Sequence, residues 1–508
     1  MLSASCMLKL IDGKRPLLAI VLGLLAVGVQ SAEAQTETVL YSFGSQVGDG
    51  SNPYAGLTLD TKGNLFGTTF QGGANGYFYG TIFEVTAARA EKVLHSFGNP
   101  GGDGQYPVAG LTLDTKGNLY GTTSGGGSGR YDLGVGTVFE VTAAGAEKVL
   151  YSFGSQPGDG DGSTPQGGLI LDSKGNLYGT TLRGGAYGGG TVFEVTAAGA
   201  EKVLYSFYSQ PGDGFGPYAG LALDINGNLY GTTFYGGAYG SGTVFEVTAA
   251  GTEKVLYSFG SSAGDGNTPS ASVIFDTKGD LYGTTRYGGA YKGGTVFELT
   301  AAGAEKVLHS FGSQAGDGNT PVAALILDRK GNLYGTTWQG GAYNQGTVFE
   351  LTAAGEEKVL YSFGSQSGDG LVPGAGLTFD KMGNLYGTTY YGGAYGNGTV
   401  FLVTLPNFTI RASPTSATVS AGQSTSSTLK LSSVGGFSGT VKLSCGFPTG
   451  KGLSCGVSPS SVTLSGPPAT ANLSIGTASG TPAGVYKIKA KGVSGTLSNT
   501  TTFTLTVN

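Results

Sequence analysis

Histidine and cysteine are both scarce: the 508 residues include two histidines, His95 and His309, and three cysteines. Structural zinc sites are built mainly from cysteine and histidine side chains, so we expect no zinc site. With so few histidines, catalytic arrangements of serine, histidine and aspartate, or of cysteine and histidine, are also excluded. Both histidines occupy a position where five other copies of a repeated segment have tyrosine, which indicates a packing role.

The three cysteines leave one pair for the mature protein. Cys6 falls within an N-terminal segment that we expect to be removed, so Cys445 and Cys455 remain. An even number of cysteines in an exported chain is typical of disulfide bonding. We therefore predict one disulfide, between Cys445 and Cys455.

Long hydrophobic runs are missing apart from one near the N-terminus. The run LLAIVLGLLAVGV at residues 17–29 follows a basic stretch and precedes a small-residue site that ends at Ala34. Its length of about 13 residues is too short for a transmembrane helix and is typical of a cleaved secretory signal. We therefore predict a signal peptide at 1–34, no transmembrane segment after its removal, and a secreted or cell-surface protein.

Charged residues are few and unevenly distributed. They make up 12% of the chain, about half of ordinary usage. The segment 406–508 has no aspartate or glutamate and seven basic residues, whereas residues 35–405 carry 18 basic against 31 acidic residues. Export and an acidic repeat segment argue against nucleic acid as a partner. The basic segment could dock on anionic cell-surface polymers, remain solvated, or pack against its acidic neighbour.

Glycine, in contrast, is abundant: its 96 residues are more than twice ordinary usage and separate short aromatic and β-branched runs. A Ser-Phe motif recurs with phenylalanine at 43, 97, 153, 207, 259, 311 and 363, in steps of 52 to 56 residues. A fixed period of about 50 residues is typical of propeller-type arrays. Each period holds four strand-like runs joined by glycine-bearing turns, which in the third unit are 168–172, 176–181, 191–196 and 201–207.

The chain begins with the end of its own repeat. The segment 37–43 matches the fourth strand of each unit, whereas the last unit stops after three strands, at Thr404. We expect the N-terminal strand to complete the last unit and to close a seven-bladed β-propeller of four-stranded blades at 35–404, without open sheet edges. A β-solenoid is the competing fold, but solenoid rungs are usually shorter than 52 residues and need no separate strand.

The repeat pattern stops at Leu405-Pro406. The remaining segment, 405–508, is rich in serine, threonine and glycine and contains at least seven short alternating runs. About a hundred residues with this pattern predict an immunoglobulin-like β-sandwich. The fold class predicted for the whole chain is therefore all-β.

The repeated unit, GNLYGTTxxGGAYGxGTVFEVT followed by EKVLYSFGSQxGDG, resembles the GloVer tandem repeats of secreted bacterial proteins over residues 37–404. The string D-x-x-G-N-L-Y is also similar to NHL-type propellers, whereas the downstream tryptophan of Kelch repeats is missing from every unit. The C-terminal strings GGFSGTVKLSC and SPSSVTL resemble immunoglobulin-like modules of exported bacterial proteins, in which the two cysteines are bonded. The GloVer resemblance implies export and a repeat scaffold, and it brings no assigned activity and no catalytic residues.

Two positions vary among units that are otherwise nearly identical. They directly follow Gly-Thr-Thr and include the only tryptophan, whereas the tyrosine of the GGAY motif repeats too strictly to indicate a selected contact. Aromatic rings beside arginine and glutamine suit stacking on sugar rings, with polar groups fixing the orientation. The alternative is packing under a neighbouring loop. The candidate ligand-binding residues are Phe70, Arg183, Tyr235, Arg286, Tyr287, Trp338, Tyr390 and Tyr391.

Aspartate recurs in a Gly-Asp-Gly loop once per unit, at 49, 103, 159, 213, 265, 317 and 369, with Asp161 as an extra residue. Such loops could contribute to a Ca²⁺ site, but one carboxylate is few for an ion that takes six to eight oxygens. The alternative is that each aspartate stabilises a tight turn. The aspartates that end the first strand of each unit, from Asp60 to Asp380, are expected to cap turns.

These features predict an exported, non-enzymatic, monomeric recognition or surface-scaffold protein without a cofactor. We expect it to bind an extracellular polysaccharide or cell-surface polymer at the rim that carries the GDG and GGAYG loops. One alternative is a carbohydrate-active lyase or hydrolase, which requires unique acid, base or arginine groups; an insertion with Arg130 and Asp132 is the only hint of these. Another alternative is a purely structural envelope or matrix protein.

Overall fold

The computed structural model describes residues 37–76, 78–99, 102–128, 135–155, 160–447, 452–495 and 497–508. The signal peptide predicted at 1–34 and the insertion with Arg130 and Asp132 lie outside these residues. The elements of the described part are all strands, which confirms the all-β prediction. Within those same ranges, no helix has the length and apolar character needed to cross a membrane.

Each repeat forms one antiparallel sheet of four strands, and these are called the first to seventh sheets in chain order. Tight turns join the strands; in the first repeat, Asp60 Oδ1 accepts hydrogen bonds of 2.8 Å from the backbone N–H groups of Lys62 and Asn64. The predicted turn caps are thus confirmed. The strands of the first six sheets are β3 (Thr58–Leu59), β4 (Leu65–Thr69), β6 (Thr81–Val85) and β7 (Glu91–Ser96); β9 (Thr112–Leu113), β10 (Leu119–Thr123), β12 (Thr137–Val141) and β13 (Glu147–Ser152); β14 (Ile170–Leu171), β15 (Leu177–Thr181), β16 (Thr191–Val195) and β17 (Glu201–Ser206); β19 (Ala222–Leu223), β20 (Leu229–Thr233), β22 (Thr243–Val247) and β23 (Glu253–Ser258); β25 (Ile274–Phe275), β26 (Leu281–Thr285), β28 (Thr295–Leu299) and β29 (Glu305–Ser310); and β31 (Ile326–Leu327), β32 (Leu333–Thr337), β34 (Thr347–Leu351) and β35 (Glu357–Ser362).

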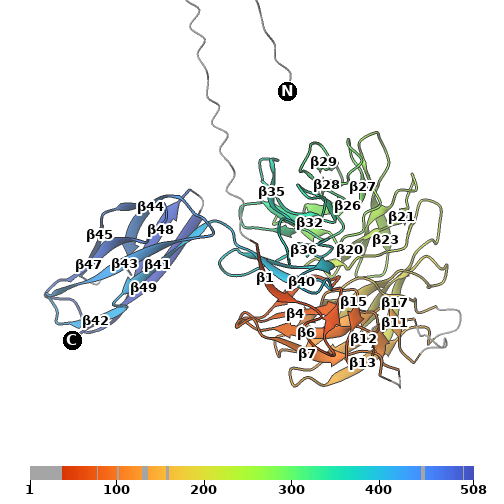
Figure 1. Cartoon of the computed structure of the whole chain (residues 1–508), viewed down its shortest axis with the longest axis horizontal. Helices are drawn as coiled ribbons and strands as arrows, with labels where there is room; N and C mark the ends of the chain where they lie inside the picture. The colour runs from red at the N-terminus through yellow and green to blue at the C-terminus, as the bar shows by residue number, and fades with distance from the viewer. Residues whose placement is uncertain are drawn as a thin grey trace, which may run out of the picture. The chain divides into compact units, whose positions relative to one another are not determined.

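The seventh sheet combines the two ends of the repeat segment. It consists of β37 (Thr378–Phe379), β38 (Leu385–Thr389), β40 (Thr399–Val403) and the N-terminal strand β1 (Glu37–Ser42). β1 runs antiparallel to β40, with Glu37 opposite Val403 and Ser42 opposite Thr399. Figure 1 shows these two strands side by side. The prediction that the N-terminal strand completes the last unit is therefore confirmed.

The structure corrects the predicted architecture. The expected closed seven-bladed β-propeller is replaced by a tandem β-repeat array, in which the described strands divide into many small sheets of two to four strands that are mostly not closed. The additional two-stranded sheets, which the sequence did not indicate, are β2 (Gly50–Ser51) with β5 (Gln71–Gly72), β8 (Gly104–Gln105) with β11 (Gly125–Gly126), β18 (Gly214–Phe215) with β21 (Tyr235–Gly236), β24 (Gly266–Asn267) with β27 (Tyr287–Gly288), β30 (Gly318–Asn319) with β33 (Gln339–Gly340), and β36 (Gly370–Leu371) with β39 (Tyr391–Gly392).

These small sheets form because glycines let the GDG loop and the GGAYG loop of one repeat approach closely. Gly72 has a φ of 86°, and a Cβ atom at this position would lie 2.5 Å from the carbonyl oxygen of Asp49. The next residue, Gly73, donates its N–H to that oxygen at 2.9 Å. The loops that the sequence placed on one rim therefore do contact one another, but as short paired strands.

The strand boundaries follow the predicted ones except for the first strand of each unit. In the third unit the strand predicted at 168–172 pairs only over Ile170–Leu171, because Asp172 already accepts the hydrogen bonds of the following turn. The other three strands, 177–181, 191–195 and 201–206, agree with the prediction to within one residue at each end.

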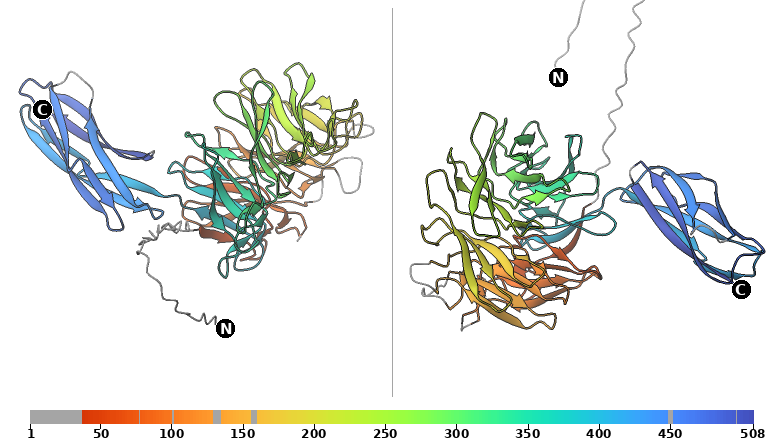
Figure 2. Two further views of the ribbon diagram at one scale, coloured as in Figure 1. Left: turned by 90° about the horizontal axis from the view of Figure 1, so that it is seen from above. Right: turned by 180° about the vertical axis from the view of Figure 1, so that it is seen from behind.

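The hydrophobic core of the repeats lies between successive sheets. Val192 and Phe207 of the third repeat pack with Leu229 and Phe245 of the fourth. A Cβ atom at Gly231 would lie 2.6 Å from Cζ of Phe245, so the glycine of the LYGTT motif provides the space for this ring. Figure 2 shows the sheets of the repeats from two further sides, with neighbouring repeats in neighbouring colours.

The same type of cluster joins the last repeat to the first. Phe43 and Val400, which belong to the seventh repeat, pack with Leu57, Leu65 and Phe83 of the first. Phe43 is fully buried in this contact. The first and seventh repeats are therefore packed together in the same manner as repeats that adjoin in sequence.

The C-terminal segment forms two sheets around one core. Alternate residues such as Leu429, Leu473, Ile488 and Phe503 are buried between them. The predicted Cys445–Cys455 disulfide is confirmed, with the two Cα atoms 6.2 Å apart. The four-stranded sheet contains, in spatial order, β41 (Asn407–Ser413), β43 (Ser424–Val434), β47 (Ala469–Thr477) and β45 (Leu453–Ser458), and the five-stranded sheet contains β42 (Ser416–Val419), β49 (Leu497–Val507), β48 (Gly484–Ser494), β44 (Gly439–Gly446) and β46 (Ser461–Leu464).

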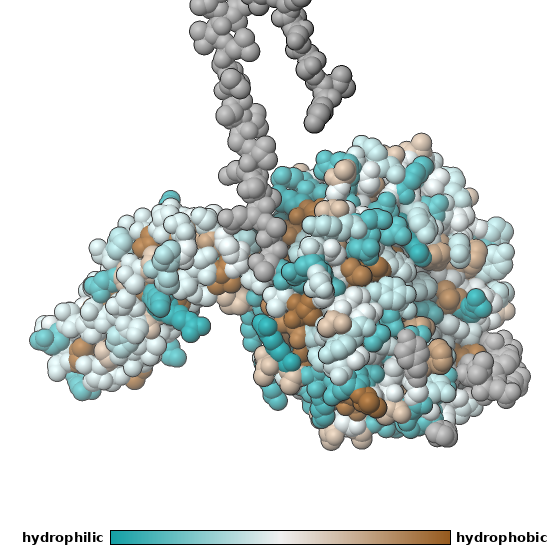
Figure 3. Space-filling model, viewed as in Figure 1, coloured by the Kyte–Doolittle hydropathy of each residue, from teal (hydrophilic) through white to brown (hydrophobic). Residues whose placement is uncertain are grey.

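The exposed surface is mostly hydrophilic or neutral on the face shown in Figure 3, and the hydrophobic patches over the repeats are small and separate. Large contiguous apolar patches usually mark interfaces with other proteins. On this face, the described residues form no large apolar patch of the type that marks such an interface.

Candidate functional site

The two variable positions after Gly-Thr-Thr differ in where their side chains lie. In the fourth repeat they are Phe234, which is half-buried, and Tyr235, which is 49% exposed. Side chains alternate in direction along an extended chain, so neighbours lie on opposite sides. Tyr235 is the first residue of β21, and its ring stacks on that of Phe215 in β18 with centroids 5.4 Å apart.

A cavity of about 490 Å³ brings variable residues of several repeats together. Arg183, Tyr235 and Arg286 line it, and so do Tyr54 and Tyr218. Its volume falls within the range of about 300–1,000 Å³ that is typical of small-molecule sites. We call it the arginine cavity.

A second cavity of about 380 Å³ lies beside the first. Phe70 and Tyr390 line it, together with Tyr106, and it shares Tyr54 and Tyr218 with the arginine cavity. The two tyrosines thus stand between the cavities, although they come from the first and fourth repeats.

Tyr54 is the centre of an aromatic cluster. Its ring lies 5.8 Å from Tyr390 and 6.3 Å from Trp338, in both cases edge to face, while Tyr218 lies 6.1 Å from Phe234. Burial raises the pKa of Tyr54, and interactions with Tyr218, which include a hydrogen bond, raise it further. Tyr54 therefore stays neutral and presents an uncharged hydroxyl beside apolar ring faces.

Arg286 is held in place by two rings. Its guanidinium carbon lies 5.2 Å from the centre of the Trp338 ring and 5.3 Å from that of Tyr287, which is within the range of cation–π attraction. Its Nε atom is buried and has no hydrogen-bond partner among the described residues. A buried donor without an acceptor destabilises the folded protein, so a ligand that supplies the acceptor removes this penalty and binds more tightly.

The structure therefore brings five of the predicted residues to cavities: Arg183, Tyr235 and Arg286 to the first, and Phe70 and Tyr390 to the second. Trp338 lines neither cavity, but its ring contacts both Arg286 and Tyr54. Tyr287 and Tyr391 are 45% and 48% exposed and stand outside both linings. Ligand binding by these residues stays a prediction.

Sequence reasoning missed Tyr54 and Tyr218. Both follow the proline of the GDG loop, at a position that also varies among the units. That variation was the available signal, and the occupants of the position are Tyr54, Val108, Gln166, Tyr218, Ser270, Val322 and Gly374. The strictly repeated GGAY tyrosines, by contrast, are exposed by 53% to 58% in five repeats and are not packed inside.

The GDG aspartates have the contacts of turn-stabilising residues. Asp49 Oδ2 accepts hydrogen bonds from the hydroxyl of Tyr41 at 2.8 Å and from the N–H groups of Gly44 and Ser45, and its Oδ1 accepts one from the N–H of Gly50. At Asp49 these donors engage both carboxylate oxygens, which fits a turn better than a Ca²⁺ ligand set.

In the third repeat Asp161, and not Asp159, takes this role, because Tyr151 donates its hydroxyl to Asp161 at 2.7 Å. Asp159 itself lies outside the described residues. Because that loop has an extra Gly-Asp pair, the aspartate that accepts the tyrosine hydrogen bond comes two residues later in the sequence.

The two histidines pack as predicted, since the His95 ring contacts Phe97 edge to face with centroids 4.8 Å apart. Each histidine also lies beside two carboxylates. His95 of the first sheet adjoins Asp103 of the loop that follows and Glu147 of the second sheet, and His309 of the fifth sheet adjoins Asp317 and Glu357 in the same way. The glutamates could not be found from the sequence, because they belong to the next sheet.

The fold and the site define a tandem β-repeat protein with an aromatic, arginine-containing cavity. The chain belongs to the Gloeobacter/Verrucomicrobia repeat family, whose model matches residues 28–224 and 210–401. This confirms the GloVer resemblance of the repeats. The match ends before the C-terminal segment, so the immunoglobulin-like class of that segment stays a prediction. No curated protein matches the chain.

Solved structures give only distant likenesses. The BP39L lectin from Burkholderia pseudomallei is 14% identical over 69% of this chain and 98% of its own, with a TM-score of 0.43. Domains 4 and 5 of the S-layer protein SbsC are 16% identical over 37% of this chain and 95% of their own, with a TM-score of 0.16. A PapD-like domain of human CEP192 is 17% identical over 20% of this chain and 84% of its own, with a TM-score of 0.15. Likenesses this weak establish neither fold nor function.

Proposed function

We propose that this chain is an exported, non-enzymatic recognition protein that binds an acidic polysaccharide in the arginine cavity. The observation that carries the proposal is Arg286, a cation with a buried, unpartnered Nε at the wall of an aromatic cavity of about 490 Å³. Aromatic faces suit sugar rings, and arginine suits the carboxylate of a uronic acid.

The composition of the cavity also supports binding over hydrolysis. Its described lining contains two arginines, Arg183 and Arg286, and no aspartate, glutamate or histidine. Glycoside hydrolysis ordinarily uses a pair of carboxyl groups that flank the bond to be broken. A cationic lining without such a pair is suited to holding a polyanion.

The other features fit a location outside the cytoplasm. The Cys445–Cys455 disulfide suits an oxidising compartment, as does the family of secreted repeats that the chain resembles. The basic C-terminal segment would be attracted to the same acidic polymers. A purely structural surface scaffold is the second candidate function.

Trp338 provides the test, because it is the only tryptophan and lies against Arg286. We expect its fluorescence to change when alginate or polygalacturonate oligosaccharides are added, and to stay constant with neutral dextran oligosaccharides. Arg286→Gln should weaken binding about 10- to 100-fold, because a hydrogen bond to a charged group contributes about 1.5–3 kcal/mol.

The matched control is Arg329→Gln, which removes the same charge from an exposed turn residue outside the arginine cavity. This variant should bind as the wild type does. If the wild-type protein binds none of these polysaccharides, the scaffold function is favoured. If both variants lose affinity equally, binding depends on the overall charge of the protein and not on the arginine cavity.

A further inference from the structure

A three-residue arrangement recurs where neighbouring repeats meet. It combines the ring before the Ser-Phe motif, the GDG aspartate, and the first glutamate of the fourth strand in the next sheet. Between the third and fourth sheets these are Tyr205, Asp213 and Glu253. The Tyr205 hydroxyl donates a hydrogen bond of 3.0 Å to Asp213 Oδ2, and the Glu253 carboxyl group lies beside both.

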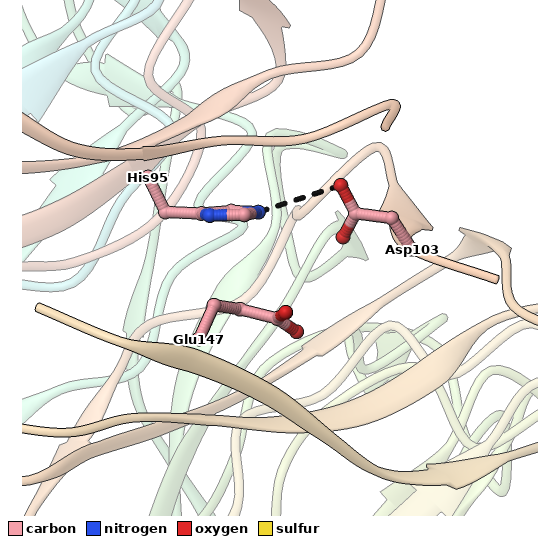
Figure 4. A group of neighbouring side chains, drawn as sticks. All are labelled: His95, Asp103 and Glu147. Atoms are coloured by element: carbon pink, nitrogen blue, oxygen red, sulfur yellow. Dashed lines mark ion pairs between the residues drawn. The ribbon is translucent and has the colours of Figure 1, made fainter. Parts of the chain in front are cut away.

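Histidine replaces this tyrosine twice. His95 Nε2 lies 3.4 Å from Asp103 Oδ2, and His309 Nε2 lies 3.6 Å from Asp317 Oδ1, which are longer than the tyrosine hydrogen bonds. Figure 4 shows the imidazole edge of His95 and the carboxylates of Asp103 and Glu147 directed toward a common space.

The substitution adds a buried imidazole nitrogen without a hydrogen-bond partner to a site whose glutamate Oε1 atom is unpartnered in the tyrosine-containing repeats as well. His95 Nε2 and Glu147 Oε1 in one cluster are buried without a hydrogen-bond partner among the described residues. In the other cluster the same holds for His309 Nε2, Glu357 Oε1 and Asp317 Oδ1. Groups of this kind are rare in native proteins unless something binds them.

We propose that each of these two clusters, His95–Asp103–Glu147 and His309–Asp317–Glu357, binds a divalent transition-metal ion such as Zn²⁺. One imidazole nitrogen and two carboxylate oxygens form a donor set suited to Zn²⁺ or Mn²⁺, whereas Ca²⁺ and Mg²⁺ prefer oxygen alone.

The geometry requires only small adjustments. The candidate ligand atoms of each cluster lie within 4.8 Å of one another. In tetrahedral coordination, bonds of about 2.0–2.2 Å place two ligands of one zinc ion about 3.3–3.6 Å apart, so each side chain must shift by up to about 1 Å to close the site.

Asp317 is already oriented for this role. It is 5% exposed, and its Oδ2 accepts hydrogen bonds of 2.9 Å from both the N–H and the hydroxyl of Ser313. These contacts fix the carboxylate and leave Oδ1 toward His309, as supporting hydrogen bonds do for metal ligands. At the other cluster, a cavity of about 580 Å³ reaches Asp103 and Glu147 and provides room for water to complete the coordination.

The experiment uses the full mature chain without a polyhistidine tag, stripped with a chelator and titrated with Zn²⁺ by calorimetry. We expect two equivalents to bind and the melting temperature to rise with Zn²⁺ concentration, because binding to the folded state stabilises it. Co²⁺ should give visible d–d absorption bands, whose intensity reports a four-coordinate site. Mg²⁺ should cause no comparable effect.

The chain itself offers the matched control. The double variant His95→Tyr and His309→Tyr installs the residue that five other repeats carry, so it should fold and melt like the metal-free wild type. We expect it to bind no Zn²⁺, and each single variant to bind one equivalent. Glu147→Gln, which removes a ligand charge and keeps His95, should abolish binding at the first cluster alone.

Two outcomes would overturn the proposal. One is a stripped wild-type chain that takes up no Zn²⁺, Mn²⁺ or Co²⁺. The other is a double variant that binds Zn²⁺ as the wild type does. Neither outcome bears on polysaccharide binding, because none of the six residues lines the arginine cavity.

Discussion

The hydroxyl of Thr388 donates a hydrogen bond of 2.9 Å to the carbonyl oxygen of Ala55, a residue 333 positions earlier in the chain. The equivalent contact joins repeats that adjoin in sequence, as between Thr232 and Ala271 at 3.0 Å. Both threonines are buried. The last repeat therefore contacts the first through the same threonine-to-carbonyl hydrogen bond that joins each pair of successive repeats.

This relationship predicts equal costs for equivalent substitutions. Thr388→Val keeps the side-chain shape but removes the donor to Ala55, so the free energy of unfolding should fall by about 1–3 kcal/mol. Thr232→Val makes the same change between the fourth and fifth repeats and serves as the control. Urea denaturation measures both. A loss confined to Thr232→Val would show that the first and last repeats do not depend on their contact.

Strand β1 should be indispensable for the seventh sheet. Deletion of residues 37–43 removes the partner of β40 and the fully buried Phe43, whose side chain alone contributes about 1.5–3 kcal/mol. We expect a lower melting temperature and association through the exposed edge of β40, measured by size-exclusion chromatography. A synthetic peptide of residues 37–46 should bind in trans and reverse both effects, whereas a scrambled peptide should not.

The strand glycine of the LYGTT motif should tolerate no side chain. Gly231→Ala places a methyl group 2.6 Å from the Phe245 ring, and overpacking of this kind costs about 1–3 kcal/mol of unfolding free energy. Gly446→Ala, where a Cβ atom meets nothing within 4 Å, is the matched control and should be neutral. Adding Phe245→Leu should recover part of the loss caused by Gly231→Ala, as measured by thermal denaturation.

Buried glutamates should make the protein less stable as the pH rises. Burial, followed by the charge of Asp213, raises the pKa of Glu253 from 4.5 to about 7, and burial raises that of Glu37 to about 8. Between about pH 4.5 and 8 the folded chain therefore holds protons that the unfolded chain has released. The free energy of unfolding should fall through this window and level off above it.

Urea denaturation at pH 5 and pH 8 checks this expectation. Glu253→Gln removes one of the titrating groups, so its stability should differ less between the two pH values than that of the wild type. A wild-type chain that is more stable at pH 8 than at pH 5 would contradict the assignment.

The sequence predicted the features that depend on local pattern or on the repeat register. The strands of the units, the turn caps such as Asp60 and the pairing of Glu37–Ser42 with the last unit all follow from a period that the chain displays seven times. The disulfide followed from a count of two remaining cysteines. These inferences needed no knowledge of which repeats meet in space.

The remaining features depend on contacts between repeats, which a single sequence does not reveal. Tyr54 and Tyr218 adjoin only because of the way the first and fourth repeats are placed, and Glu147 reaches His95 from the following repeat. The short paired strands arise from glycine backbones whose loops meet after folding. The closed propeller was wrong because the repeat period indicates the number of units but not how their strands divide among sheets.

The pairing of β1 with β40 also sets an order of events during synthesis. Glu37 emerges long before its partner Val403, and at about 5–20 residues per second the delay is roughly 20 to 70 seconds. Throughout that time an apolar strand must remain unpaired or be held by a chaperone. Only the last repeat to be made supplies its partner, so the seventh sheet cannot form before Val403 has been synthesised.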